Sequence, residues 1–141
     1  MALTKVKITV NSTVKNEDDP LPEYTSESYL GHIKHTEREG VVHIAYKSES
    51  EGAVTETRAE IFDDAVRLVR FGAIESNMLF EVGHEHTSVY KIPPFSFDMT
   101  LSTERIQNSL SPLGGTLTLK YVMTVGGAKK DCLMKISVTP V

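Results

Sequence analysis

The stretch Thr116–Val125, TLTLKYVMTV, decides the fold class because hydrophobic and polar residues alternate along nearly all of its length. Its hydrophobic alternate positions are Leu117, Leu119, Tyr121, Met123 and Val125. Successive side chains of a β-strand point to opposite faces of the sheet, so this pattern predicts a strand with one buried face.

The same period of two recurs from the N-terminus to the C-terminus. The hydrophobic positions of three further runs are Val6, Ile8 and Val10, then Phe95, Phe97, Met99 and Leu101, and finally Met134, Ile136 and Val138. A weaker run extends from Tyr24 to about Thr36, and Gly31 inside it indicates a bulge or a sharp bend. Thr103–Asn108 is the one short stretch in which a turn of helix competes with a strand.

Turn-forming residues separate these runs every 8–15 residues or so, with no alternation of strands and helices. Glu51-Gly52, Gly114-Gly115 and Gly126-Gly127 are typical of tight hairpins. We therefore expect an all-β protein, a single antiparallel up-and-down β-barrel of about eight to ten strands that occupies residues 1–141.

Composition narrows the class of function. The 141 residues are 40% hydrophobic and carry a net charge of −4, so no positive field is available to gather nucleic acid or an anionic membrane. The first residues alternate rather than form a signal peptide, and Cys132 is the only cysteine, so we expect a cytoplasmic protein. No glycine-rich phosphate motif is present, and no cofactor is expected.

Arg70 is the first candidate for a ligand-binding residue. Arg67 and Arg70 point to opposite faces of one strand because their separation is odd, and Arg70 shares its face with Val66 and Leu68. A buried guanidinium needs a carboxylate, either from the ligand or from the protein. The more common explanation is a structural ion pair, and Glu56 or Glu60 is the expected partner.

Two tyrosines could join Arg70 around a polar head group. Tyr121 lies on the hydrophobic face of its strand, and Tyr90 lies on the short strand before Pro93. A buried phenol needs a hydrogen-bond partner, which is more often a backbone carbonyl than a ligand.

His84 and His86 are the most conspicuous candidates for a metal-binding site in the sequence. Histidines two apart on a strand share a face and can ligate zinc or copper, with His32, His35 or His43 as the third ligand. A polar hairpin tip after Gly83 is the simpler interpretation. Cys132 is more typical of a small core or surface thiol than of a nucleophile, and without a catalytic constellation we do not expect an enzyme.

An ordered set of residues in the second half of the chain resembles the YwiB-like family of small bacterial proteins. The set begins with Arg70, Gly72, Phe80, Gly83, Tyr90 and Pro93, and ends with Thr103, Ile106, Gly115 and Tyr121. The family usually has a glycine shortly after the proline, where this chain has Phe95. The resemblance implies a calycin-like barrel, similar in shape to lipocalins and fatty-acid-binding proteins, and implies no reaction.

Two functions compete on this sequence. The first is binding of a small apolar or anionic ligand inside the barrel, held by Arg70, Tyr90 and Tyr121. The second is a filled barrel that acts through its outer face or as a homodimer, with Val69 and Phe71 on the exposed patch.

Overall fold

The computed structural model describes residues 3–36, 40–111 and 113–141. Ten strands account for almost all of these residues. They are β1 (Thr4–Asn16), β2 (Glu23–Thr36), β3 (Val41–Ser50), β4 (Ala53–Ile61), β5 (Ala65–Gly72), β6 (Ser76–Glu81), β7 (Glu85–Ile92), β8 (Phe95–Asn108), β9 (Gly115–Val125) and β10 (Ala128–Pro140).

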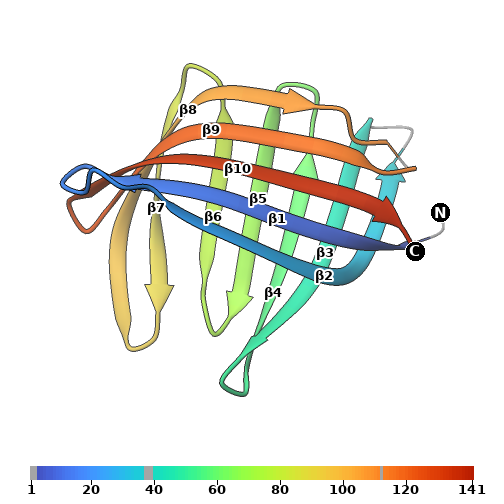
Figure 1. The fold of residues 1–141 in the computed structure, drawn as a ribbon, viewed down its shortest axis with the longest axis horizontal. Helices are drawn as coiled ribbons and strands as arrows, with labels where there is room; N and C mark the ends of the chain where they lie inside the picture. The colour runs from blue at the N-terminus through green and yellow to red at the C-terminus, as the bar shows by residue number, and fades with distance from the viewer. Residues whose placement is uncertain (1–2, 37–39, 112) are drawn as a thin grey trace.

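The strands form one antiparallel sheet in the order β6-β5-β4-β3-β2-β1-β10-β9-β8-β7. Each strand pairs with a neighbour in sequence, and β1 also pairs with β10, which confirms the expected up-and-down arrangement. In Figure 1, β8, β9, β10, β1 and β2 run across the front, while β3 to β7 run up and down behind them. The sheet therefore curls round on itself, as a barrel requires.

The barrel is nearly closed, because its two end strands, β6 and β7, meet without forming a regular ladder. Glu75 and Lys91 exchange two backbone hydrogen bonds of 2.9 and 2.8 Å beside one end of this seam. At the other end, the amide nitrogen of Gly83 donates to the carbonyl oxygen of Thr103 at 3.2 Å. Between these contacts the facing edges of β6 and β7 carry no paired ladder in the described residues.

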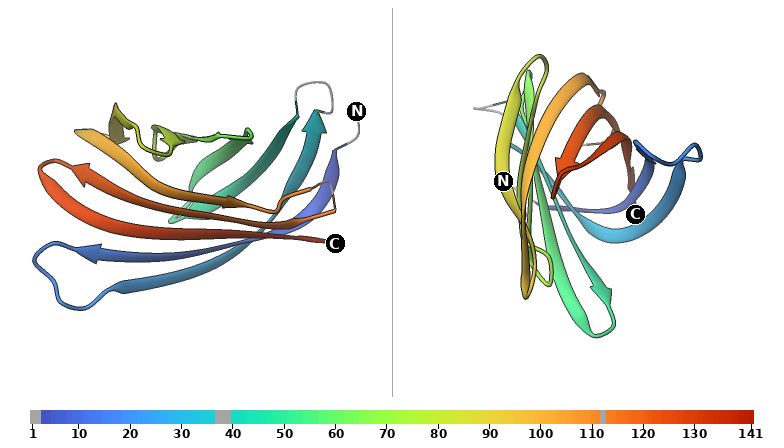
Figure 2. Two further views of the ribbon diagram at one scale, coloured as in Figure 1. Left: turned by 90° about the horizontal axis from the view of Figure 1, so that it is seen from above. Right: turned by 90° about the vertical axis from the view of Figure 1, so that its left-hand side faces the viewer.

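The barrel interior is filled at one end only. The filled end holds both chain termini, which appear on the right of Figure 1, together with the β4–β5 and β6–β7 turns, which appear at the top. Its fully buried side chains are Val6, Ile8, Ile33, Ile61, Val66, Leu68, Phe80, Met99, Leu101, Leu117, Leu119 and Val138. The opposite end, which we call the open end, holds the β1–β2, β3–β4, β5–β6, β7–β8 and β9–β10 turns. The right-hand panel of Figure 2 views the molecule from the side of the β1–β2 and β9–β10 turns.

Two local expectations need correction. The register on both sides of Gly31 is continuous, so this glycine marks no bulge, although β2 bends sharply along its length in Figure 1. A Cβ at Gly31 would collide with the carbonyl oxygen of Ala45, so Gly31 allows a close approach of β2 to β3. Thr103–Asn108 is not helical but continues β8 through an irregularity between Thr103 and Arg105. In the described residues, no helix is long and apolar enough to cross a membrane.

Candidate functional site

Two cavities lie toward the open end of the barrel and share Arg70. The first, which we call the polar cavity, has a volume of about 630 Å³. It is lined by Glu27, Ser28, Tyr29, Tyr46, Ser48, Glu49, Ser50, Ala53, Thr55, Thr57, Arg70, Ala73 and Ile74. The second, the apolar cavity, has a volume of about 400 Å³. It is lined by Arg70, Met78, Tyr90, Ile92, Phe97, Tyr121, Met123, Val125, Gly126, Ala128, Lys130 and Met134.

Arg70 faces the interior, as its separation from Arg67 predicted, and lies where the two cavities meet. It is half-buried on β5, and no carboxylate lies within 4.0 Å of it in the part of the chain that the structure describes. Such a guanidinium can form a charge-assisted hydrogen bond with an anion that enters the barrel.

The expected ion pair of Arg70 with Glu56 or Glu60 was wrong. The Oε1 atom of Glu56 lies 3.0 Å from the Nη2 atom of Arg58, its neighbour on the same face of β4. Glu60 is opposite Arg67 in the β4–β5 register, whereas Arg70 is opposite Thr57. Both glutamates belong to the face of β4 that alternates with its buried residues, so neither approaches Arg70.

The structure brings both candidate tyrosines to the same cavity as Arg70. Tyr121 is buried, and its ring packs edge-on against Phe80 with centroids 4.9 Å apart. Burial raises the pKa of the Tyr121 hydroxyl, so this group stays protonated and can donate a hydrogen bond. Tyr90 is half-buried on β7, the last strand in the sheet order, and lines the same cavity.

Ser76 is a candidate that the sequence analysis missed. It is opposite Arg70 in the β5–β6 register and only 6% exposed. In the described residues its Oγ atom has no hydrogen-bond partner, and both Ser76 and Arg70 line a shallow depression at the β5–β6 edge of the barrel. A buried hydroxyl without a partner is costly, so this position favours an additional polar group close to Arg70.

The polar cavity holds a second group of residues that the sequence analysis missed. The rings of Tyr29 and Tyr46 stack with centroids 4.5 Å apart. The hydroxyl of Tyr29 donates a hydrogen bond to the carboxylate of Glu27, and burial together with this bond raises the pKa of that tyrosine. Glu49 lines the same cavity, which therefore combines carboxylates, stacked aromatic rings and one guanidinium.

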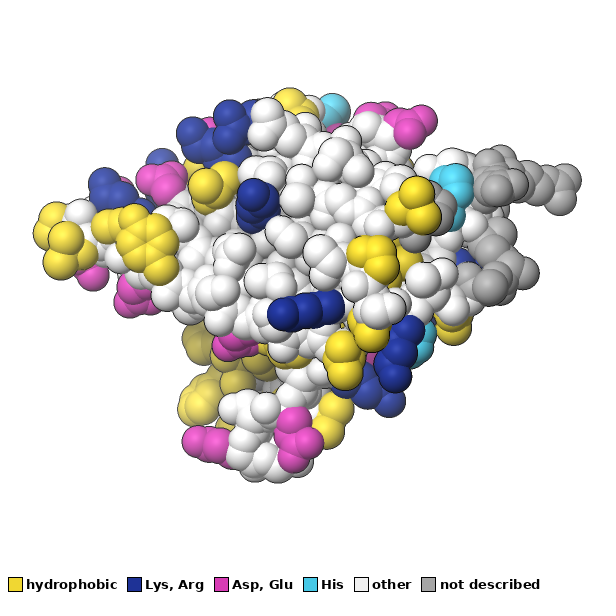
Figure 3. All heavy atoms as spheres, turned by 45° about the vertical axis from the view of Figure 1, so that its right-hand side comes forward, with side chains coloured by type: hydrophobic (Ala, Val, Ile, Leu, Met, Phe, Trp, Pro, Cys, Tyr) yellow, Lys and Arg dark blue, Asp and Glu magenta, His cyan; other side chains and the backbone are white. Residues whose placement is uncertain are grey.

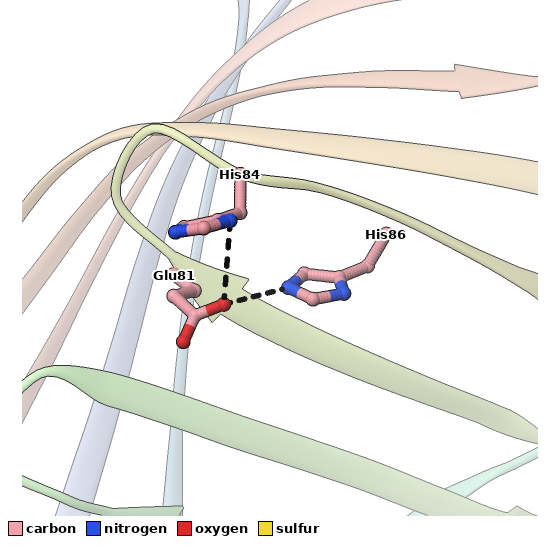
Figure 4. A network of polar contacts seen from close by, with 3 residues as sticks. All are labelled: Glu81, His84 and His86. Carbon is pink, nitrogen blue, oxygen red and sulfur yellow. Dashed lines mark hydrogen bonds and ion pairs between the residues drawn. The ribbon is translucent and has the colours of Figure 1, made fainter.

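His84 and His86 lie around Glu81 near the β6–β7 turn, as Figure 4 shows. The Oε1 atom of Glu81 lies 3.3 Å from Nε2 of His86 and 3.9 Å from Nδ1 of His84. The prediction of a third histidine ligand was wrong. His32, His35 and His43 lie on β2 and β3, and the strands β4 and β5 separate them from β6 in the sheet. The described residues contain no group of three side chains placed to hold a metal ion.

Cys132 is buried on β10 beside Tyr121 of β9. Burial raises the pKa of its thiol to about 11. A thiol that stays protonated near neutral pH is a weak nucleophile, so this environment is typical of a core residue.

The residues expected on a docking patch lie on the outer face of β5. Phe71 is 38% exposed, and the Arg58 guanidinium lies 5.3 Å from the centroid of its ring. Val69 is half-buried. On the part of the molecule drawn in Figure 3, charged side chains of both signs are scattered among uncharged ones.

Comparisons with known proteins agree with the fold. The family model of the "Domain of unknown function (DUF1934)" matches residues 8–136. The chain is 26% identical over 89 residues to the "Uncharacterized beta-barrel protein YwiB" of Bacillus subtilis (strain 168), and this match spans 63% of each chain. The crystal structure of the ywiB protein from Bacillus subtilis superposes with a TM-score of 0.81 at 20% sequence identity. That superposition covers 99% of this chain and 93% of the other.

Proposed function

This chain belongs to the DUF1934 family, and within that family of β-barrels we propose that it binds a small amphipathic ligand with an anionic group. The hydrocarbon part occupies the apolar cavity, and the anionic group meets Arg70. Binding of this kind requires no chemical step. We also propose that the protein is cytoplasmic, because a single free thiol suits that reducing compartment.

The observation that carries this proposal is the environment of Arg70. Its guanidinium lines both cavities and has no ion-pair partner among the described residues. Taking a positive charge partly out of water without a partner is costly, so an arginine in this position favours a ligand that supplies the missing negative charge. The tyrosines that line the same apolar cavity add hydroxyl donors near that charge.

The size and lining of the apolar cavity agree with a ligand of this class. Its volume of about 400 Å³ lies within the range of roughly 300–1,000 Å³ that is usual for small-molecule sites. Met78, Met123 and Met134 supply flexible apolar side chains, which adapt to a hydrocarbon chain.

Calorimetric titration with dodecanoate, kept below its micelle concentration, tests the proposal. We expect the wild type to bind and Arg70→Met to lose at least about tenfold in affinity, since a hydrogen bond to a charged group contributes about 1.5–3 kcal/mol. Arg67→Met is the matched control, because Arg67 is exposed on the opposite face of β5 and its Nε donates to Asn77 at 3.3 Å.

Thermal unfolding of the free Arg70→Met protein separates binding from stability. Because Arg70 has no described ion-pair partner, we expect this variant to unfold at the wild-type temperature or above it. Failure of dodecanoate and of longer or shorter alkanoates to bind the wild type would refute the proposal. It would leave a surface role, with Val69 and Phe71 on β5, as the remaining hypothesis.

A further inference from the structure

The polar cavity carries more negative than positive charge. Among the described residues that line it, Arg70 is the only cationic side chain, whereas Glu27 and Glu49 are carboxylates. A ligand with an anionic group alone would satisfy Arg70 but would lie in the same cavity as two like charges. A ligand that also carries a positive charge would complement the whole cavity.

The stacked Tyr29 and Tyr46 rings provide the second element of a cation site. Their centroids lie 4.5 Å apart, and the Tyr29 hydroxyl donates to Glu27. In accepting that hydrogen bond, the Glu27 carboxylate lies beside the aromatic pair. Aromatic rings beside a carboxylate are the combination that attracts ammonium groups, by cation–π and charge interactions together.

Arg70 defines the order in which the ligand's groups must follow one another. Apart from Arg70 on β5, the apolar cavity is lined by residues of β6 to β10, whereas the polar cavity is lined by residues of β2 to β4 and by Ala73 and Ile74. Opposite Arg70 in the β5–β6 register, Ser76 is only 6% exposed, and its hydroxyl has no partner in the described part of the chain, although Ser76 lines neither of these two cavities.

We propose that the ligand is a zwitterionic amphiphile with an alkyl chain, then an anionic group, then an ammonium group. The alkyl chain occupies the apolar cavity, the anionic group contacts Arg70, and the ammonium group lies near Glu27 and the tyrosine pair. This inference rests on the proposed function and specifies the class of head group that the same site selects.

Three probes that share a dodecyl chain test the inference by calorimetric titration below their micelle concentrations. Dodecylphosphocholine carries both charges in the proposed order, dodecanoate carries only the negative one, and dodecyltrimethylammonium carries only the positive one. We expect dodecylphosphocholine to bind roughly tenfold tighter than either of the other probes, since a cation–π contact and a carboxylate partner both contribute.

Substitution of Glu27 makes the test specific to the head group. Glu27→Gln should weaken dodecylphosphocholine binding about tenfold and leave dodecanoate binding unchanged, because only the former places an ammonium group there. Glu49→Gln is a second variant in the same cavity, for use if Glu27→Gln does not fold. Glu60→Gln is the matched control, because Glu60 lies on the outer face of β4 and lines neither cavity.

The possible outcomes separate the two proposals. If dodecanoate binds as tightly as dodecylphosphocholine and the Glu27 and Glu49 variants change neither affinity, the head-group inference is wrong while the proposed function stands. If dodecyltrimethylammonium binds as tightly as dodecylphosphocholine, the anionic group contributes nothing, and both proposals are wrong. If no probe binds the wild type, the proposed function itself fails.

Discussion

A guanidinium inside a barrel loses part of its hydration, and this loss has to be offset by contacts with other groups. Arg70 gains no carboxylate from the described residues, although its neighbours on the strand face, Val66 and Leu68, are fully buried. Hydrophobic packing of the rest of β5 holds it in place. A hydrophobic residue at this position would cost less free energy of folding than the arginine does. Such a position is typical of a site that favours binding over stability.

The inward direction of Arg70 could be predicted from sequence, but its surroundings could not. The odd separation from Arg67 and the hydrophobic residues Val66 and Leu68 were sufficient for the direction. The identity of its neighbours depends on register, which places Thr57 on one side of Arg70 and Ser76 on the other. A one-residue shift of β4 would have turned Glu56 inward, and no local pattern excludes that shift.

Cys132 gives a prediction for the pH dependence of stability. Burial raises the pKa of its thiol from the ordinary value of 9.0 to about 11 in the folded protein. Because the pKa is higher in the folded state, the neutral thiol makes its full contribution to folding stability at pH values below the pKa of the unfolded state. This contribution is lost as the pH rises toward the pKa of the folded state. Cys132→Ala should therefore lower the free energy of unfolding by about 1 kcal/mol near pH 8, and near pH 10.5 this difference should vanish or reverse, because only the wild type loses stability as its thiol ionises on unfolding.

Urea unfolding of both proteins at the two pH values checks this prediction. The comparison of variant with wild type at each pH removes the contributions of lysines and other groups that titrate in the same range. A difference in stability that stays constant between the two pH values would show that the Cys132 thiol does not titrate differently in the folded state.

Among the strands, the strength of the alternating pattern decided how well each could be predicted. The pattern of β9 is regular because Leu117 and Leu119 face the filled part of the barrel and Tyr121, also buried, lies at its border with the apolar cavity. The pattern of β2 is weak because its inward positions near the open end are polar, and include Glu27. The close approach at Gly31 and the irregularity at Arg105 depend on neighbouring strands, so sequence alone could not specify them.

The seam between β6 and β7 leads to a prediction for hydrogen exchange. Each of these strands pairs regularly on one side only, whereas β1 and β10 have paired neighbours on both sides. We expect the edge amides of β6 and β7 to exchange with free energies of opening near zero, and the central amides of β1 and β10 to approach the global stability of about 5–15 kcal/mol.

Exchange measured residue by residue by nuclear magnetic resonance checks this prediction. The backbone bonds between Glu75 and Lys91 provide an internal control, because these two amides should be better protected than the edge amides of β6 and β7. Uniform protection across β6, β7, β1 and β10 would mean that the seam is closed in solution.

At the scale of the whole molecule, the division into a filled half and a hollow half follows from where hydrophobic inward positions end. On β3, Val42 and Ile44 face the filled half, and the same face continues with Tyr46 and Ser48 toward the open end. On β4, Ile61 and Ala59 at the filled end give way to Thr57 and Thr55. Polar inward residues cannot form a dry core, so their positions along the strands mark where the cavities begin.

This division predicts how affinity depends on the chain length of a ligand. Each methylene that enters the apolar cavity contributes about 0.8 kcal/mol, or about a fourfold gain in affinity. The packed side chains of the filled half limit the depth, so affinity should rise from octanoate upward and then level off once the cavity of about 400 Å³ is full. Calorimetric titration of a series from octanoate to hexadecanoate measures the slope and the point at which the gain stops.

A variant that fills the cavity tests whether the hollow half sets this limit. Met123→Trp adds bulk to the lining of the apolar cavity, so the affinity should level off at a shorter chain. Leu133→Trp is the matched control, because Leu133 is exposed on β10 and does not line that cavity. If the affinity levels off at the same chain length in Met123→Trp and in the wild type, the hydrocarbon chain binds elsewhere, since a tail inside the barrel must compete with the tryptophan for a fixed volume.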